Sequence, residues 1–379
     1  MLPKRPCVSM KNTLARIVSA FGVVASFSAL MTLIGIWFFR TQAVSPTFPY
    51  YYSLLAYVQD AAYALWGYFD GVHYLRLIEN GYVDTGTQAF FPLYPTLVSF
   101  TSNLTGLNAY LSAVAFSIFA LTLSLIFLWQ LFPKAKYRNT FFLLLFPTSF
   151  FFLSVYTESL FLLLSLAFFL SLKKERYVVA SLLAGLASAT RLVGVFLGLV
   201  LVWHLLSRYK TSRLFYVLSL AILCLSGFIG YSYFLWSKFG DPLMFMHVQE
   251  MFGANRSGGE LILLPQVLYR YAKMVLTVDP TTFLYQRIWL ELIFFMGAAY
   301  AWFKNLKSNT LEINLYVISS LLLPTLTGTL SSIPRYILVL TPFLLPQTMK
   351  KTHFFLLLTF NFFLMLYLYS HFAHGTFVA

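Results

Sequence analysis

The sequence is poor in charge and in cysteine. Only 10% of its 379 residues are charged, while 59% are apolar. A soluble domain carries about 25% charged residues, so this chain lacks the polar surface that water requires, and a disordered chain is also far more polar than this one. Cys7 and Cys224 lie far apart and match neither a disulfide framework nor a metal motif. The long apolar runs, with little of the alternation of barrel strands, predict an all-α polytopic membrane protein.

Apolar runs and basic residues together predict the topology. We expect a single integral-membrane domain, residues 1–379, with about 11 transmembrane helices over residues 17–39, 107–133, 139–157, 159–172, 177–190, 192–207, 214–237, 283–303, 313–330, 336–349 and 352–371. With the N-terminus in the cytoplasm, the short inner connections hold most of the basic residues. The net charge of +14 therefore reports topology and does not indicate a nucleic-acid partner.

Two outer segments, residues 40–106 and 237–282, are too long for simple turns and hold most of the acidic residues. Aromatic residues in 50–66 predict a helix lying in the membrane interface. Residues 90–104 predict a helix at the outer rim, and a twelfth span is the alternative. Because the acids need solvent or partners, we expect the two segments to fold over one another above the spans.

Asp70 is the first candidate for chemistry. It lies in Trp-Gly-Tyr-Phe-Asp-Gly-Val-His-Tyr, residues 66–74, where aromatic residues flank the acid and Gly71 follows it. Apolar surface beside a carboxylate raises its pKa, which suits a general base. The alternative is a solvated loop aspartate without a chemical role.

Four motifs follow one another along the chain. They are Asp-Gly-Val-His-Tyr (70–74) with Ala-Phe-Phe-Pro-Leu-Tyr-Pro (89–95), Phe-Pro-Thr-Ser-Phe (146–150) with Tyr-Thr-Glu-Ser-Leu-Phe (156–161), Ala-Thr-Arg-Leu-Val-Gly (189–194), and Ser-Ile-Pro-Arg-Tyr (332–336). In this order they resemble the PIG-V type mannosyltransferases, a family that includes the enzyme adding the second mannose in GPI-anchor synthesis and its bacterial relatives. The resemblance covers roughly residues 60–379.

The resemblance implies a GT-C fold and a membrane hexosyltransferase. Such an enzyme moves a sugar, here mannose, from a polyprenyl-phosphate donor to a lipid-linked or cell-surface glycan acceptor, with inversion and an outward-facing site. The family's catalytic acid maps onto Asp70. The compact length, and Phe69 where the family has Trp, favour a bacterial plasma membrane over the endoplasmic reticulum membrane.

Arg191 and Arg335 are the candidate ligands of the donor phosphate. Arg191 interrupts the uncharged stretch 177–207, and a charge in such a stretch is costly without a partner. Arg335 lies at the predicted outer end of a span, and a guanidinium can bind two phosphate oxygens at once. The alternatives are a snorkelling loop arginine at 191 and an interfacial anchor at 335.

Further candidates surround these residues in the predicted site. Glu158 could hold Arg191 or a sugar hydroxyl, with a structural ion pair as the alternative. His73 follows Asp70 by one helical turn and could bind phosphate or orient the acid. The remaining candidates for substrate binding are Gln88, His247 and Tyr336.

The cofactor and the class of protein stay open at this stage. A divalent ion is compatible with Asp60, Asp70, Glu79 and Asp84, although no spacing forms a dedicated site. The competing functions are a secondary transporter or lipid flippase, and a structural subunit of a larger complex. A transporter needs charges at the bilayer midplane, whereas this chain concentrates its acids outside, which favours surface chemistry.

Overall fold

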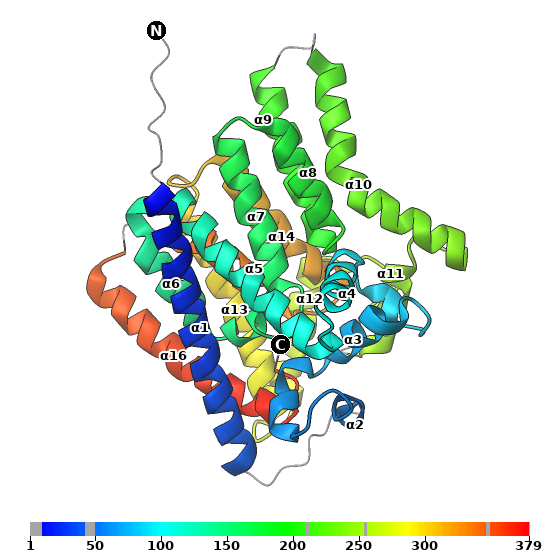
Figure 1. The fold of residues 1–379 in the computed structure, drawn as a ribbon, viewed down its shortest axis with the longest axis vertical. Coiled ribbons are helices and arrows are strands. Elements are labelled where there is room, and N and C mark those ends of the chain that lie inside the picture. The colour runs from blue at the N-terminus through cyan, green and yellow to red at the C-terminus, as the bar shows by residue number, and fades with distance from the viewer. Residues whose placement is uncertain (1–9, 42–49, 210–212, 254–255, 346–348, 379) are drawn as a thin grey trace.

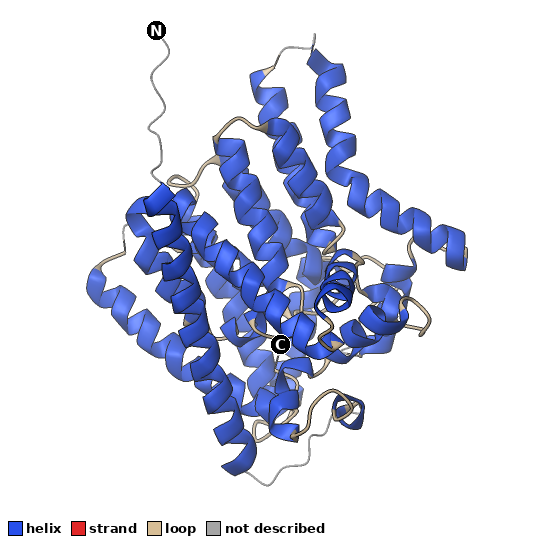
Figure 2. Ribbon diagram, viewed as in Figure 1, coloured by secondary structure: helices blue, strands red, loops and turns tan. Residues whose placement is uncertain are grey.

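The computed structural model describes residues 10–41, 50–209, 213–253, 256–345 and 349–378; residues 42–49 of the first outer segment lie outside the described part. Every regular element within these ranges is a helix, as Figure 2 shows. The α-helices are α1 Met10–Thr41, α2 Tyr51–Leu54, α3 Asp70–Asn80, α4 Leu93–Thr105, α5 Ala109–Leu131, α6 Lys136–Leu144, α7 Glu158–Lys173, α8 Tyr177–Ser188, α9 Val195–Arg208, α10 Leu214–Phe239, α11 Met244–His247, α12 Leu264–Thr277, α13 Phe283–Asn305, α14 Leu311–Leu322, α15 Ile333–Leu344 and α16 Lys351–Ala373. The all-α prediction is confirmed.

Four helices of the described residues are long and apolar enough to cross a membrane. They are Thr13–Thr41 in α1, and α5, α10 and α16. Shorter apolar helices accompany them over Tyr177–Ser188, Leu192–Arg208, Leu311–Thr327 and Ile333–Leu344. The structure thus supports a helical membrane protein, while the predicted count of eleven spans is not reproduced.

Two of the predicted spans are broken by proline. In the run 139–157, α6 ends at Leu144 and a 3₁₀ helix, Ser149–Phe152, follows after a turn that contains Pro147. In the run 313–330, α14 passes into the 3₁₀ helix Leu323–Thr327, which carries Pro324 in its first turn. Proline lacks the amide hydrogen and clashes with the preceding turn, so neither run continues as one α-helix.

The first outer segment also differs from its prediction. The expected interfacial helix 50–66 is split into α2, four residues long, and the 3₁₀ helix Ala61–Gly67. Asp60 caps the start of this 3₁₀ helix, because its carboxylate accepts a hydrogen bond from the amide of Ala62. The same carboxylate pairs with Arg40 at 2.7 Å. Helix α4 has 13 residues, about 20 Å, which is too short to cross a hydrocarbon core of about 30 Å. This supports the outer-rim helix over the twelfth span.

Helix α7 lies at the centre of the bundle, between α5 and α8 (Figure 1). Its residues are buried along nearly their whole length. Helices α8 and α10 approach closely, since a Cβ added at Gly227 would lie 2.2 Å from the carbonyl oxygen of Gly185. Small residues allow such close packing between helices in lipid. Helix α7 also packs against α15, and α8 against α9, so these helices form one packed bundle.

The two outer segments pack against one another, as predicted. The ring of Phe91 lies 5.4 Å from that of Phe245, and the ring of Phe90 lies 5.5 Å from that of Phe252. In Figure 1 the α7–α8 connection, the last turn of α9 and the first turn of α10 lie at the end of the bundle where α1 begins, and α3 and α4 lie toward the other end. The two outer segments therefore form one cap, and this cap lies away from the end of α7 and the α7–α8 connection, which carry Lys173, Lys174 and Arg176.

Candidate functional site

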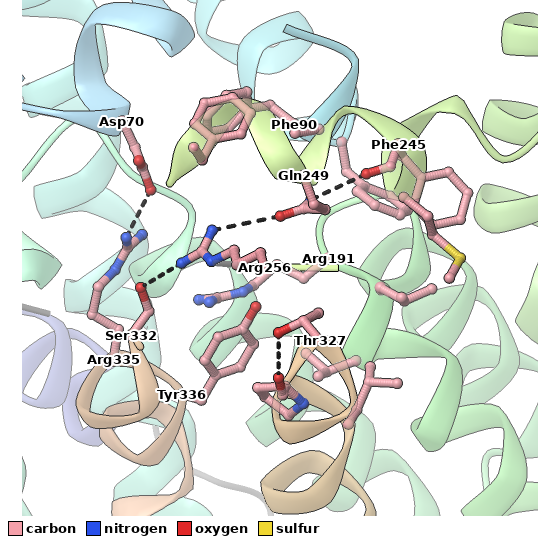
Figure 3. A pocket seen from close by; sticks show the side chains of 18 of the residues that line it. Asp70, Phe90, Arg191, Phe245, Gln249, Arg256, Thr327, Ser332, Arg335 and Tyr336 are labelled. Carbon is pink, nitrogen blue, oxygen red and sulfur yellow. Dashed lines mark hydrogen bonds and ion pairs between the residues drawn. The ribbon is translucent and has the colours of Figure 1, made fainter. Parts of the chain in front are cut away.

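A cavity of about 350 Å³ lies beneath this cap (Figure 3). One part of its wall is polar and carries Asp70, His73, Arg191, Arg256 and Arg335. Another part is apolar, formed by Leu192, Val193, Phe245, Met246, Leu323 and Leu326. Such a cavity matches a molecule with a charged head and an apolar tail.

Asp70 and Arg335 are in direct contact in the wall of the cavity. Arg335 Nη1 donates a hydrogen bond to Asp70 Oδ2 at 2.7 Å, with the two side chains 8% and 26% exposed, respectively. This contact meets the near-contact geometry that a single catalytic site requires of its residues. Asp70 begins α3, and Arg335 lies in the first turn of α15. The residues just before these helices, Phe69 (φ 54°) and Ser332 (φ 67°), both have a positive φ. Strained backbone of this kind is concentrated at functional sites.

Glu158 joins Arg335 to Arg191. Its Oε1 accepts from Arg335 Nε at 2.9 Å and lies 3.2 Å from Arg191 Nη1. The Glu158 side chain is fully buried at the start of α7, where these two guanidiniums are its ion-pair partners. The ring of Tyr336 lies 4.6 Å from the guanidinium of Arg191. Asp70, Arg335, Glu158 and Arg191 thus form a buried row in which negative and positive side chains alternate.

The row also gathers the four motifs. Thr148 donates a hydrogen bond to the carbonyl of Pro334, next to Arg335. Asp70, Glu158 and Arg191 represent the other motif segments, and Arg335 is 265 positions from Asp70 in the chain. The structure therefore brings segments far apart in sequence into one site.

Burial acts on the pKa of two cavity-lining groups of α3, Asp70 and His73. Burial raises the pKa of Asp70, but the charge and hydrogen bond of Arg335 outweigh it, so the pKa lies below its ordinary value of 3.8. The expectation that apolar surroundings raise this pKa is wrong in its net direction, because a guanidinium lies beside the carboxylate. Burial lowers the pKa of His73 below 6.5, although Asp70 acts in the opposite direction. At neutral pH, Asp70 is ionised and His73 is neutral.

Three of the predicted residues do not line the cavity: Glu158, buried behind Arg191 and Arg335, and also Gln88 and His247. The Gln88 side chain is buried in its own turn, where it accepts from the amide of Gly86 and donates to the carbonyl of Asp84. His247 is half exposed and contacts Asp241 Oδ2 at 2.6 Å. His73 does line the cavity, with its ring stacked on Phe90 at 5.3 Å.

Arg256 lines the cavity although the sequence did not single it out. Its Nη2 donates to Ser332 Oγ at 3.2 Å, and its Nη1 lies 3.5 Å from Gln249 Oε1. Figure 3 shows its guanidinium between Gln249 and Ser332, near Arg191 and Tyr336. Its position on an outer segment, where the positive-inside rule leaves few basic residues, is the signal that could have identified it.

The four carboxylates considered for a divalent ion bind different partners. Asp60 pairs with Arg40, Asp70 with Arg335, and Glu79 accepts from the hydroxyl of Tyr57. Asp84 lies 3.9 Å from Arg76. Among the residues with described positions, no group of three or more His, Cys, Asp or Glu is arranged to hold a metal ion.

The fold and the site define a helical membrane protein with a capped, amphipathic cavity and a buried row of alternating charges. No protein-family model, no curated protein and no solved structure matches this chain. Its function is therefore argued from the site.

Proposed function

We propose that the protein is a membrane glycosyltransferase. It moves a sugar from a polyprenyl-phosphate donor to a hydroxyl of a glycan or glycolipid acceptor. The observation that carries this proposal is an ionised carboxylate, Asp70, held by Arg335 in the wall of a cavity with polar and apolar parts. The motif resemblance names mannose as the sugar, and the clustering of all four motifs around Asp70 supports it.

Asp70 acts as the base for the acceptor. The acceptor oxygen attacks the anomeric carbon, the bond from that carbon to the phosphate oxygen breaks, and the hydroxyl proton passes to Asp70. A carboxylate with a lowered pKa is a weak base for an alcohol, so the proton moves late, once the new bond has made the hydroxyl acidic. Attack from the face opposite the phosphate inverts the anomeric carbon.

The leaving group is a lipid phosphate, which needs positive charge beside it. Arg335 already contacts two carboxylates, Asp70 and Glu158, so its role is to hold Asp70 in place. Arg191 contacts one carboxylate and faces the cavity. Of the two arginines expected to bind phosphate, Arg191 is therefore the better placed.

The site lies on the outer side of the membrane in this proposal. The cap formed by the outer segments excludes water from the reactive phosphate sugar. A plasma membrane is the proposed location, and the endoplasmic reticulum membrane is the alternative if the host is a eukaryote. A divalent ion stays open as a cofactor.

The test is transfer by the purified protein in liposomes. We expect labelled mannose to move from polyprenyl-phosphate mannose to an acceptor from a glycolipid panel, and Asp70→Asn to reduce the rate about 100-fold or more, the scale of general base catalysis. Asp60→Asn is the matched control, since this exposed acid of the same segment pairs with Arg40 outside the cavity. Movement of labelled polyprenyl phosphate across the bilayer without sugar transfer would instead support a transporter or flippase.

A further inference from the structure

Arg256 is a cavity arginine without an ion-pair partner among the described residues. Arg335 and Arg191 are matched by Asp70 and Glu158, so two positive and two negative charges balance in the buried row. Glu260 also lines the cavity but is exposed at its mouth and makes no ion pair with Arg256. The buried row and Arg256 together therefore carry one excess positive charge, which is that of Arg256.

The backbone holds this guanidinium over the cavity. Directly after Arg256, the amide of Ser257 donates to the carbonyl of Thr327 at 3.0 Å, and the amide of Ile262 donates to the carbonyl of Leu326 at 2.9 Å. These bonds attach the second outer segment to the 3₁₀ helix that precedes α15. The contact from Arg256 to Gln249 Oε1, at 3.5 Å, is long for a hydrogen bond and leaves that donor available to a ligand.

We infer that Arg256 binds the phosphate of the polyprenyl-phosphate donor, an inference that rests on the proposed function. A phosphodiester carries one negative charge, which equals the excess charge of the wall. When the sugar leaves, the phosphate gains a second charge, and Arg256 is the cavity guanidinium that has no carboxylate within ion-pair distance among the described residues. Arg191 lies beside it in Figure 3, so two guanidiniums face the same space.

The apolar wall continues this binding site. Leu323 and Leu326 belong to the 3₁₀ helix to which the Arg256 segment is bonded, and both line the cavity. A phosphate on Arg256 thus places the first units of the prenyl chain against apolar side chains. The second outer segment supplies the cation, whereas the first supplies the base, so both segments are needed for a complete site.

Binding without turnover tests this inference. The probes are polyprenyl phosphate and the matching polyprenol, titrated against the full-length protein in nanodiscs. We expect Arg256→Ala and Arg256→Gln to weaken binding of the phosphate about 10- to 100-fold, as loss of a charge-assisted hydrogen bond does, and to leave binding of the alcohol unchanged. Arg256→Lys keeps the charge and should restore part of the affinity.

The matched control is Lys273→Ala, which removes an exposed positive charge from α12 of the same segment. It should leave both affinities unchanged. Equal phosphate affinity in Arg256→Ala and the unsubstituted protein would overturn the role of Arg256 and leave the proposed function standing. A parent protein that binds phosphate and alcohol equally would overturn both this inference and the polyprenyl-phosphate donor.

Discussion

At the scale of single residues, Asp70 shows how a neighbour decides the charge of a buried acid. Burial by itself favours the protonated form of a carboxyl group. A guanidinium at 2.7 Å reverses the balance and holds the pKa of Asp70 below 3.8. Asp70 is then ready to accept a proton over the whole neutral range, at the expense of basic strength.

The pH dependence of transfer tests this balance. The base form of Asp70 is lost only as pH falls through its lowered pKa, so the acid limb of kcat should lie below pH 3.8. Arg335→Gln removes the main cation that opposes burial, which raises the pKa of Asp70 and moves the acid limb toward neutral pH.

Arg76→Gln is the control for this measurement, because Arg76 lies on the same helix but pairs with Asp84. Its acid limb should stay in place. An acid limb that is unchanged in Arg335→Gln would show that Arg335 does not set the titration of the base.

At the scale of elements, a second buried network holds the turn that leads into α15. Tyr271 on α12 donates to Glu291 on α13, and its hydroxyl accepts from the amide of Leu330 at 3.0 Å. Thr329 Oγ1 lies 3.1 Å from the same hydroxyl. The buried carboxylate of Glu291 thus has a partner on α12, and Arg287 of its own helix lies 3.6 Å from it. The network positions the turn that carries Ser332 and begins the helix of Arg335.

Removal of the Tyr271 hydroxyl should loosen this turn. Tyr271→Phe leaves Glu291 Oε2 and the amide of Leu330 without this partner in a buried place, so we expect the free energy of unfolding to fall by about 1 kcal/mol or more. Thermal unfolding in one detergent measures the change. Tyr269→Phe is the control, because Tyr269 lies on the same helix and is 70% exposed. Equal midpoints for the two variants would contradict the proposed role of the hydroxyl.

At the scale of the whole molecule, the cap and the base-rich connections lie toward opposite ends of the helices. The positive-inside rule assigns the base-rich end to the cytoplasm. The proposed function requires this orientation, in which the cavity would open on the outer side. This arrangement separates the base-rich α7–α8 connection from the charged residues of the cavity.

Cysteine labelling in intact cells tests the orientation. In a protein without its native cysteines, Thr85→Cys lies on the exposed part of the first outer segment and should react with a membrane-impermeant maleimide. Lys174→Cys is equally exposed, in the α7–α8 connection, and should react only after the membrane is permeabilised. The reverse pattern would place the cavity on the cytoplasmic side.

Much of the architecture follows from local properties of the sequence. Scarce charge and long apolar runs are enough to predict an all-helical membrane protein, because the bilayer accepts few charges and requires satisfied backbone groups. The aromatic surroundings of Asp70 and the length of the two outer segments likewise predict a cap that contains an acid. The helical class and the cap depend on composition and on the spacing of residues, and both can be read from the sequence without a structure.

Only the tertiary structure decided which side chains meet. The contact from Asp70 to Arg335 joins residues 265 positions apart, and it depends on how the first turns of α3 and α15 meet beside Glu158 at the start of α7. The same packing brought in Arg256 and left Gln88 and His247 outside the cavity wall. The sequence shows which charged residues lie in apolar surroundings and therefore need partners. The packing of the helices selects those partners, because a guanidinium reaches only the carboxylates that the backbone places within a few ångströms of it.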